Sequence, residues 1–578
     1  MRPKSTTTVV RVAALVAVLG WAGVSAQQPP RDTPLGGQAQ SPPATGRITG
    51  RVVDAVTGRP MKMVTVRLTS ETGGRSGQTD GAGIFDFTSL PAARYNVRVM
   101  KAGYVSLAYG QRRPLQPGTP LQLEAGQHIK GIEFRMPRGS VVSGTVSDEI
   151  GDPMPGIMVR LMRFQYAQGV RELVPAGNAQ TDDRGVYRVW GLDPGEYFVS
   201  AVAPNFNGGG PTPPVPVGRG GRGGPPGRGG PPPGGDMEVG YAPTYYPGVP
   251  SAAEASAVTL GLGAELLDIN FNVLLVRTAQ ISGRVLNTDG TPVTAGNVSM
   301  AAEGSSFGGR TGPGTNFGGR IRWDGVFSIS NVPPGRYTLR ARGTDDTAPQ
   351  YGAMPLTVVG DDLADVAVVV SPGATMTGVV SFQGGLVPPD PTQVRVTAQA
   401  TEPGFGANVN ARVDKDGRFT LTGIPLGSMW IRAQAPRGWS LKSVVVDGRE
   451  TIDTPLNVSA DQKLTGASFV FTDRQSDLSG TLTDGSGRPL TDYTVLAFPT
   501  DSTLWRPQAR QIMTARPDQN GKFQIRGLPA GDYYLAVIDP VQQGEWFDPA
   551  FLEQQTTDAS RLSLAEGATR TQDLRLKQ

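Results

Sequence analysis

A turn glycine followed by large apolar residues at two fixed offsets occurs five times in this chain. An aromatic residue stands two positions after each glycine, and a Tyr, or in one copy a Met, stands twelve positions after it. The glycines are Gly83, Gly185, Gly325, Gly417 and Gly521. Self-similarity at fixed spacing is typical of repeat architectures. The chain is therefore predicted to fold as five copies of one structural unit.

The residues after each turn glycine alternate between apolar and polar side chains, which is typical of β-strands. In the third copy, Phe327 and Ile329 alternate with Ser328 and Ser330. A turn that contains Pro and Gly follows, and a second alternating segment begins at Tyr337. Because every second residue of a strand faces the same side, this pattern predicts sheets with one buried face.

Each copy also opens with an alternating segment that has a glycine in its interior. These glycines are Gly50, Gly144, Gly283, Gly378 and Gly480. A glycine inside a strand indicates a bulge or the close approach of another backbone. A Gly-x-Pro turn follows in four copies, at residues 58–60, 151–153, 290–292 and 487–489. Short strands with turn signals about every 8–12 residues predict a β-sandwich.

The spacing of the copies gives the expected domain boundaries. Successive turn glycines lie 102, 140, 92 and 104 residues apart, and about 95 residues are enough for a domain that folds alone. The longest spacing includes residues 207–235, which are almost only Gly, Pro and Arg and are expected to form a disordered loop. We expect a disordered linker at 27–45 and β-sandwiches, each with its own core, at 46–137, 138–277, 278–374, 375–475 and 476–578.

Residues 1–26 have the features of a secretory signal peptide. Their basic residues are Arg2, Lys4 and Arg11. The apolar run that follows has about 13 residues, fewer than the ~20 of a membrane-spanning helix, and Val24-Ser25-Ala26 fits a cleavage site after Ala26. The formal net charge of +4 falls to 4 − 3 = +1 once these residues are removed. We therefore expect an exported protein, in the periplasm, at the cell surface or outside the cell, whose mature chain has no membrane span.

The composition excludes several kinds of site. The chain has no Cys and one His, so disulfide scaffolds, thiol catalysis and sites with two imidazoles are ruled out. His128, the single His, is interpreted as a lone surface residue. Residues 304–308 match Gly-x-Ser-x-Gly, but the helix that a nucleophile elbow requires does not follow them. Asp414 and Asp416 lack the other ligands of a calcium loop and are interpreted as turn residues. No catalytic residue, metal or cofactor is expected.

The first copy resembles a known family, the carboxypeptidase regulatory-like domain. The residues that carry the resemblance are Gly50-Arg-Val-Val-Asp54, Thr57-Gly-Arg-Pro60, Gly83-Ile-Phe85, Leu90-Pro91, Tyr95 and Gly103-Tyr104. The resemblance extends over five tandem copies, although the fourth lacks the Gly-x-Pro turn and has Met429 in place of Tyr. It implies an exported bacterial protein with an all-β fold of five tandem, seven-stranded, transthyretin-like β-sandwich modules after the signal peptide. It further implies a carbohydrate-binding-like fold that is an accessory, non-catalytic module.

Aromatic residues that break the burial pattern are the best candidates for binding. Trp190 stands at an outward-facing position where the other copies have Thr, Ser or Arg. Tyr245 and Tyr246 follow the Gly/Pro/Arg segment, and Trp505 and Trp546 belong to the last copy. Flat aromatic rings can stack on sugars or fill a pocket of a partner protein. Packing between neighbouring copies is the alternative interpretation.

Two functions are favoured over a third, a divergent enzyme whose cleft would hold His128 near a Ser and a carboxylate. Five equivalent modules without a catalytic constellation favour a non-enzymatic interaction or spacer protein, in which weak sites on tandem copies act together. The alternative is a carbohydrate-binding protein that uses its exposed aromatic residues. The expected partners are a polysaccharide or a cell-surface protein, and not nucleic acid. A short helix that begins after Asp548 and ends at Gln555 is expected in the last copy and is interpreted as a connection.

Overall fold

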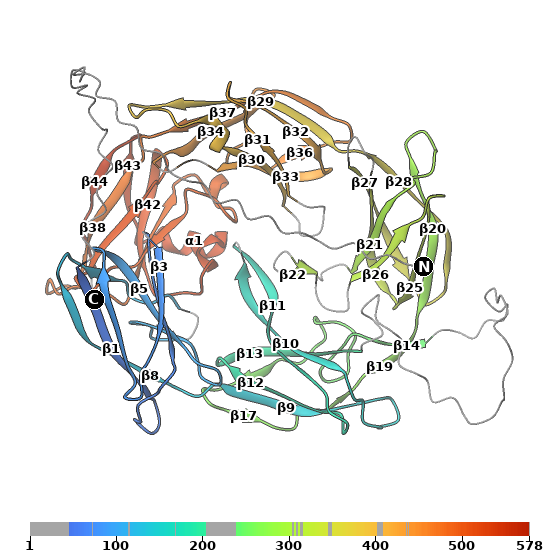
Figure 1. Cartoon of the computed structure of the whole chain (residues 1–578), viewed down its shortest axis with the longest axis horizontal. Helices are drawn as coiled ribbons and strands as arrows, with labels where there is room; N and C mark the ends of the chain where they lie inside the picture. Colours follow the sequence, from blue (N-terminus) through green and yellow to red (C-terminus); the bar gives the residue numbers. More distant parts are fainter. Residues whose placement is uncertain are drawn as a thin grey trace, which may run out of the picture. The chain divides into compact units, whose positions relative to one another are not determined.

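The computed structural model describes residues 45–576 apart from 72, 114–115, 168, 204–238, 303–305, 308–309, 312–315, 345–348, 402–407, 435 and 437. The expected signal peptide, the cleavage site at Ala26, the linker up to residue 44 and the loop at 207–235 lie outside the described residues. Strands dominate the rest of the chain (Figure 1), which confirms the all-β fold class. The five copies are called repeats one to five below.

In every repeat, the first strand lies in the middle of one sheet. These strands are β1 (Gly46–Asp54), β9 (Ser140–Ser147), β20 (Ala279–Asn287), β29 (Ala374–Gln383) and β38 (Asp477–Thr483). Each pairs in antiparallel fashion with the strand after the turn glycine: β4 (Ile84–Leu90), β12 (Val186–Leu192), β25 (Val326–Val332), β32 (Arg418–Ile424) or β41 (Lys522–Arg526). Each also pairs in parallel with the end of its repeat: β8 (His128–Met136), β17 and β18 (Glu265–Leu266, Phe271–Asn272), β28 (Leu363–Pro372), β37 (Lys463–Thr472), or β44 and β45 (Thr569–Thr571, Leu574–Arg575).

The second strand set of each repeat has the next long strand between two antiparallel partners. In repeat three, β27 (Gln350–Val358) pairs with β28 and joins the two sets into one seven-stranded sheet. The middle strands are β2 (Thr65–Ser70), β10 (Met158–Ala167), β21 (Gly296–Ala302), β30 (Arg395–Ala400) and β39 (Thr494–Pro499). The partners before the turn glycine are β3 (Gly73–Gln78), β11 (Val170–Gln180), β24 (Asn316–Ile321), β31 (Val409–Arg412) and β40 (Met513–Ala515). The partners after it are β5 (Ala93–Met100), β13 (Gly195–Val202), β26 (Gly335–Gly343), β33 (Gly427–Gln434) and β42 (Gly531–Ile538).

Shorter elements extend this common frame. They are β6 (Leu107–Ala108), β7 (Leu121–Leu123), β14 (Val239–Ala242), β15 (Thr244–Tyr245), β16 (Val258–Leu260), β19 (Leu274–Arg277), β22 (Ser306–Phe307), β23 (Arg310–Thr311), β27 (Gln350–Val358), β34 (Ser440–Val446), β35 (Arg449–Glu450), β36 (Leu456–Val458), β43 (Ser560–Leu564) and the single-turn helices η2 (Pro391–Gln393), η3 (Ser502–Leu504) and η4 (Glu545–Phe547). The strand number therefore differs between repeats in the described part of the chain. Repeat one has the strands β1 to β8, whereas repeat four has β29 to β37, which include the short strands β35 and β36. The expected number of seven strands is thus not the same in every repeat.

The glycine inside each first strand is required by the parallel neighbour. At Gly283, a Cβ atom would lie 1.9 Å from the carbonyl oxygen of Val366. The register between β20 and β28 shifts between Ile281 and Gly283, and the extra residue on β28, Asp365, has a φ of 58°. The expected close approach and bulge are both confirmed here.

The Tyr twelve positions after the turn glycine closes the turn that precedes its strand. In the four repeats that have this Tyr, its hydroxyl donates to the carbonyl oxygen four residues upstream, at 2.7–3.0 Å; the pairs are Tyr95–Pro91, Tyr197–Asp193, Tyr337–Pro333 and Tyr533–Pro529. A buried tyrosine that bonds to a nearby upstream carbonyl is a known device of β-sandwiches. Repeat four has Met429, which is buried but cannot make this bond.

The hydrophobic cores lie between the two strand sets, as Ile48 and Phe85 with Val66 and Val97 show in repeat one. Repeat four has a core of its own. The buried residues of repeats two and three, however, form one contiguous cluster, so the expectation of a separate core for every repeat is wrong for this pair.

Repeat five has apolar residues on both faces of its second sheet. Every residue of β39 is buried, and the outer face carries a further cluster around Phe498 and Leu552. Leu552 belongs to helix α1 (Pro549–Gln555), which accompanies the strands of this repeat in Figure 1. Asp548 accepts the N–H of Ala550 at 3.0 Å, so the predicted helix and its cap are confirmed. None of the helices in the described part of the chain has the length and apolar character needed to cross a membrane.

Candidate functional site

Trp190 lies on β12 and is 57% exposed, as its outward-facing position predicts. It also lies close to repeat one: a Cβ atom on Gly103 would be 3.9 Å from Trp190 Cζ3. Gly139, at the start of repeat two, donates its N–H to the carbonyl of Gly103 at 2.9 Å. Trp190 therefore combines an exposed indole surface with a position beside the boundary between repeats one and two.

Tyr245 and Tyr246 are partly buried in repeat two. Burial raises the pKa of Tyr245 above its ordinary value. The ring of Tyr246 packs edge-on against Phe271, with 6.1 Å between the ring centroids. This contact places the ring of Tyr246 against the core that contains Phe271.

Trp505 and Trp546 lie against the outer cluster of repeat five. The indole N–H of Trp505 donates to the carbonyl of Pro499 at 2.8 Å, and its ring is 5.8 Å from that of Phe498. Trp546 packs on Phe547 but also lines a cleft. Of the five predicted aromatic residues, Trp546 is the one that the structure places in a cleft described below.

This cleft lies between repeats one and five and has a volume of about 580 Å³. Repeat one contributes Glu71, Arg94 and Asn96 among others. Repeat five contributes residues that include Arg516, Gln524, Gln543 and Trp546. We call it the one–five cleft. Its combination of an aromatic ring, two guanidinium groups and three side-chain amides is suited to binding a polar ligand.

Direct hydrogen bonds connect the two repeats around the one–five cleft. The backbone N–H of Gln122 donates to Gln519 Oε1 at 2.8 Å, and Gln519 Nε2 donates to the carbonyl of Gln122 at 2.9 Å. Arg94 donates to the carbonyl of Arg516 at 2.5 Å, and Arg516 donates to that of Pro117. Two ion pairs, Arg112 with Asp492 and Arg526 with Glu71, also join the repeats.

The two arginines of the one–five cleft are held among carbonyl groups. Arg516 is only 9% exposed, and desolvation lowers the pKa of both Arg94 and Arg516. Within the described residues, the Nε–H of each is buried without a hydrogen-bond partner, and neither guanidinium lies within ion-pair distance of a carboxylate. Both positive charges therefore lack a directly paired negative charge.

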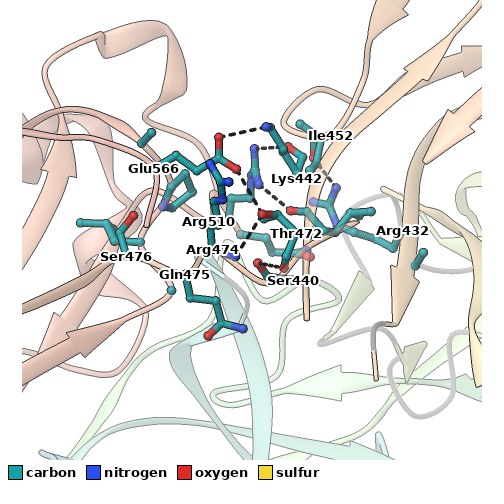
Figure 2. Close-up of a pocket in the computed structure, with 17 residues that line it drawn as sticks. Arg432, Ser440, Lys442, Ile452, Thr472, Arg474, Gln475, Ser476, Arg510 and Glu566 are labelled. Carbon is teal, nitrogen blue, oxygen red and sulfur yellow. Dashed lines mark hydrogen bonds and ion pairs between the residues drawn. The ribbon is translucent and has the colours of Figure 1, made fainter. Parts of the chain in front are cut away.

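A second cleft, of about 450 Å³, lies between repeats four and five (Figure 2). Its polar side chains bond mainly to one another. Lys442 Nζ lies 2.9 Å from Glu566 Oε2, and Thr472 donates to Glu566 Oε1 at 3.1 Å. Arg510 makes two contacts with Asp453, at 2.8 and 3.1 Å, which is the bidentate geometry of a strong ion pair.

Other polar groups of this cleft, which we call the four–five cleft, are also hydrogen-bonded. Arg510 also donates to the carbonyl of Leu441 at 3.0 Å, and Ser476 donates to that of Ala565 at 3.0 Å. Lys442 lowers the pKa of Glu566 below its ordinary value, so this carboxylate stays charged. Because the pairs join residues of repeat four to residues of repeat five, we interpret the four–five cleft as a structural junction.

The residues considered for catalysis or metal binding are separated. His128 begins β8, where its Nε2 lies 2.9 Å from Thr49 Oγ1; desolvation, Lys130 and Arg47 lower its pKa. Asp414 accepts the N–H groups of Asp416 and Arg418 at 2.9 and 2.8 Å, which confirms its interpretation as a turn residue. Most of residues 304–308 lie outside the described part of the structure. The described residues include no group of three or more His, Cys, Asp or Glu that could hold a metal ion.

The sequence interpretation missed three features of the surface. Trp323 is 78% exposed at the hairpin turn before Gly325. Its position between Arg322 and Asp324 of a polar turn is a sequence signal for this exposure. The two clefts have no such signal, since each is built from residues of two repeats.

Comparisons with known proteins support the repeat assignment. A sequence model of the carboxypeptidase regulatory-like domain matches residues 47–137 and 477–577. No curated protein matches the chain. Among solved structures, the Bacillus anthracis TIE protein is 9% identical, with 76% of this chain and 74% of that chain covered and a TM-score of 0.14.

Two pilins show similarly weak likenesses. A Streptococcal ancillary pilin is 12% identical, with coverage of 52% of this chain and 99% of that chain and a TM-score of 0.18. GBS52, the minor pilin of Streptococcus agalactiae, is 12% identical, with coverage of 40% and 95% and a TM-score of 0.21. At these scores the structural likenesses carry no argument. The family match identifies residues 47–137 and 477–577 as carboxypeptidase regulatory-like domains, and the same strand pairing recurs in the repeats between them.

Proposed function

We propose that this chain is a non-enzymatic, exported protein whose tandem β-sandwiches form an interaction or spacer scaffold. The observation that carries the proposal is the recurrence of one strand pairing in all five repeats, with the regulatory-like family matched at the first and last. Regulatory-like modules are a non-catalytic domain type, and their repetition multiplies binding surfaces instead of building one active site.

The proposed domains follow the repeats. Their boundaries are 46–137, 138–277, 278–374, 375–475 and 476–578, after a signal peptide at 1–26. Limited proteolysis of the full chain, with sequencing of the fragments, tests them. Cleavage is expected near residues 137, 374 and 475, and to be slower near 277, where repeats two and three share buried residues.

Export and the absence of turnover test the first proposal together. Expression of the full chain is expected to give a product in the periplasm or the medium whose N-terminus is Gln27. The purified product is expected to leave panels of peptide and ester substrates unchanged. Turnover that is abolished by Ser306→Ala or His128→Ala would contradict the proposal.

The second candidate function is carbohydrate binding. It is supported by the one–five cleft, where Trp546 is brought together with the side-chain amides of Asn96, Gln524 and Gln543. Aromatic rings stack on the C–H faces of sugars and amides bond to their hydroxyl groups. Retention of the full chain on a panel of immobilised polysaccharides tests this function, and loss of retention in Trp546→Ala is the expected result. Retention on none of the polysaccharides would exclude it.

A further inference from the structure

We infer that the one–five cleft binds a sugar that bears a carboxylate, such as the uronic acid unit of an acidic polysaccharide. The inference rests on the second proposed function and names the class of sugar and its site. In this arrangement Trp546 provides the aromatic surface, and Arg94 with Arg516 provides the positive charge.

The charge of the cleft is the first argument. Arg94 and Arg516 bond to carbonyl oxygens and form no ion pair with any carboxylate in the described part of the chain. The carboxylates nearest to them are engaged elsewhere. Glu71 pairs with Arg526, and Asp492 pairs with Arg112.

Asp518, the other carboxylate near Arg94, accepts two N–H groups of its own turn, from Asn520 and Lys522. The two guanidinium groups are therefore partly desolvated and have no direct carboxylate partner among the described residues. An anion that enters the cleft gains from both charges, because electrostatic interactions strengthen where water is excluded.

The polar groups that remain available are the second argument. The side-chain amides of Asn96 and Gln543 are exposed and make no hydrogen bond within the described residues. Gln524 uses its Oε1 to accept from Arg526, which leaves its N–H₂ group as a donor. Neutral side-chain amides can donate to and accept from the hydroxyl groups of a sugar. An acidic peptide would instead present mainly carboxylates and backbone amides to them.

The shape of the cleft is the third argument. A volume of about 580 Å³ lies in the ordinary range of ligand pockets, roughly 300–1,000 Å³. Trp546 lines this cleft, and a flat aromatic ring suits the apolar face of a sugar ring. The four–five cleft lacks such a residue, because no aromatic side chain lines it.

Titration calorimetry of the full chain with matched sugars tests the inference. The probes are trimers of galacturonate, glucuronate and mannuronate, and the methyl esters of the same trimers, which have the same rings without the charge. We expect at least one acid to bind at least tenfold more tightly than its ester, and salt to weaken binding of the acid alone.

A charge substitution locates the site. Gln543→Glu adds a negative charge to an exposed residue, so the fold is retained. It is expected to weaken binding of the acid at least tenfold and binding of the ester less than threefold. The matched control is Gln475→Glu in the four–five cleft, which is expected to leave binding unchanged.

Tryptophan variants give an independent readout. Trp546→Ala is expected to weaken binding of the acid at least tenfold. Trp546→Phe keeps a ring in the outer cluster of repeat five and is expected to weaken this binding less. Trp323→Ala removes an exposed indole of repeat three that does not line the cleft, and is the control.

The outcomes separate the inference from the function on which it rests. Equal binding of acid and ester supports carbohydrate binding and overturns the charge argument. Binding of the acid that Gln543→Glu does not change overturns the location. Equal binding of poly-glutamate overturns the sugar class, and no binding of any sugar overturns both the inference and the second function.

Discussion

At the scale of residues, four of the five repeats share the tyrosine twelve positions after the turn glycine, whose hydroxyl bonds to a carbonyl four residues upstream. In repeat five, Tyr533 is almost fully buried and donates to the carbonyl of Pro529 at 2.7 Å. This bond ties the start of β42 to the turn before it, so the second sheet begins in the same way in each repeat that has the tyrosine. Loss of the hydroxyl leaves a carbonyl without its partner.

Tyr533→Phe is therefore expected to destabilise repeat five by about 1–3 kcal/mol. Hydrogen exchange measured on peptides of the full chain checks this, and faster exchange is expected in β39 and β42. The control is Tyr493→Phe in the same repeat, since the Tyr493 hydroxyl has no hydrogen-bond partner in the described part of the chain. Equal effects of the two substitutions would show that the bond to Pro529 contributes nothing.

Buried tyrosines, Tyr337 and Tyr533 of this kind among them, predict an alkaline weakening of the fold. Burial raises the pKa of Tyr187, Tyr337 and Tyr533 well above the ordinary value near 10. Above about pH 10 the unfolded chain releases these protons while the folded chain retains them, so the free energy of unfolding falls as the pH rises. Denaturant titrations between about pH 8 and pH 11 check this. The loss is expected to be smaller in Tyr533→Phe, and a free energy that is constant over this range would contradict the account.

At the scale of elements, the parallel pairing of the first and last strands organises each repeat. In repeat five, a Cβ atom on Gly480 would lie 2.0 Å from the carbonyl oxygen of Gln572. Real atoms do not approach so closely, so a side chain here would force β38 away from the end of the repeat. The first sheet would then lose its parallel partner.

Gly480→Ala is accordingly expected to destabilise repeat five by about 3 kcal/mol or more, because packed backbone cannot move aside without strain. The fall in the melting temperature of the full chain, measured by calorimetry, checks this. Gly485→Ala, in the turn that follows β38, meets nothing within 4 Å and serves as the control. A variant Gly480→Ala as stable as this control would rule out the close approach.

The elements were also the part of the structure that sequence reasoning predicted best. Alternating residues such as Phe327 and Ile329 identify strands because burial of one face has a period of two. The cap at Asp548 predicted α1 because side-chain capping is a local interaction. Contacts between Arg94 and Arg516, which are 422 residues apart, have no local pattern. The one–five cleft therefore could not be predicted, although Trp546 itself was identified.

At the scale of the whole molecule, polar junctions join repeat five to repeats one and four, whereas repeats two and three share a hydrophobic cluster. Arg510 of repeat five and Asp453 of repeat four form a bidentate pair that Gln511 supports with a bond of 2.6 Å. Both charged side chains are partly buried, with 34% of Arg510 and 17% of Asp453 exposed, so removal of one leaves the other without its partner. The junction is thus expected to act as one unit.

A double-mutant cycle with Arg510→Gln and Asp453→Asn tests this junction. We expect a coupling of about 1–3 kcal/mol in the free energy of unfolding, because the residues share one network. Arg135 and Glu133 form an exposed pair that provides the comparison, for which less than about 1 kcal/mol is expected. A coupling no larger than that of the exposed pair would show that the junction is not a cooperative unit.

The central claim is that the first and last repeats meet and form the one–five cleft between them. Because the chain has no Cys, the pair Gln122→Cys and Gln519→Cys can be introduced without competing thiols. A short thiol-reactive cross-linker added to dilute protein, followed by mass spectrometry, reports whether residues 122 and 519 are neighbours. The account predicts an intramolecular cross-link in most molecules, and far less in the control pair Gln122→Cys and Arg284→Cys. Equal, low yields in the two pairs would contradict it.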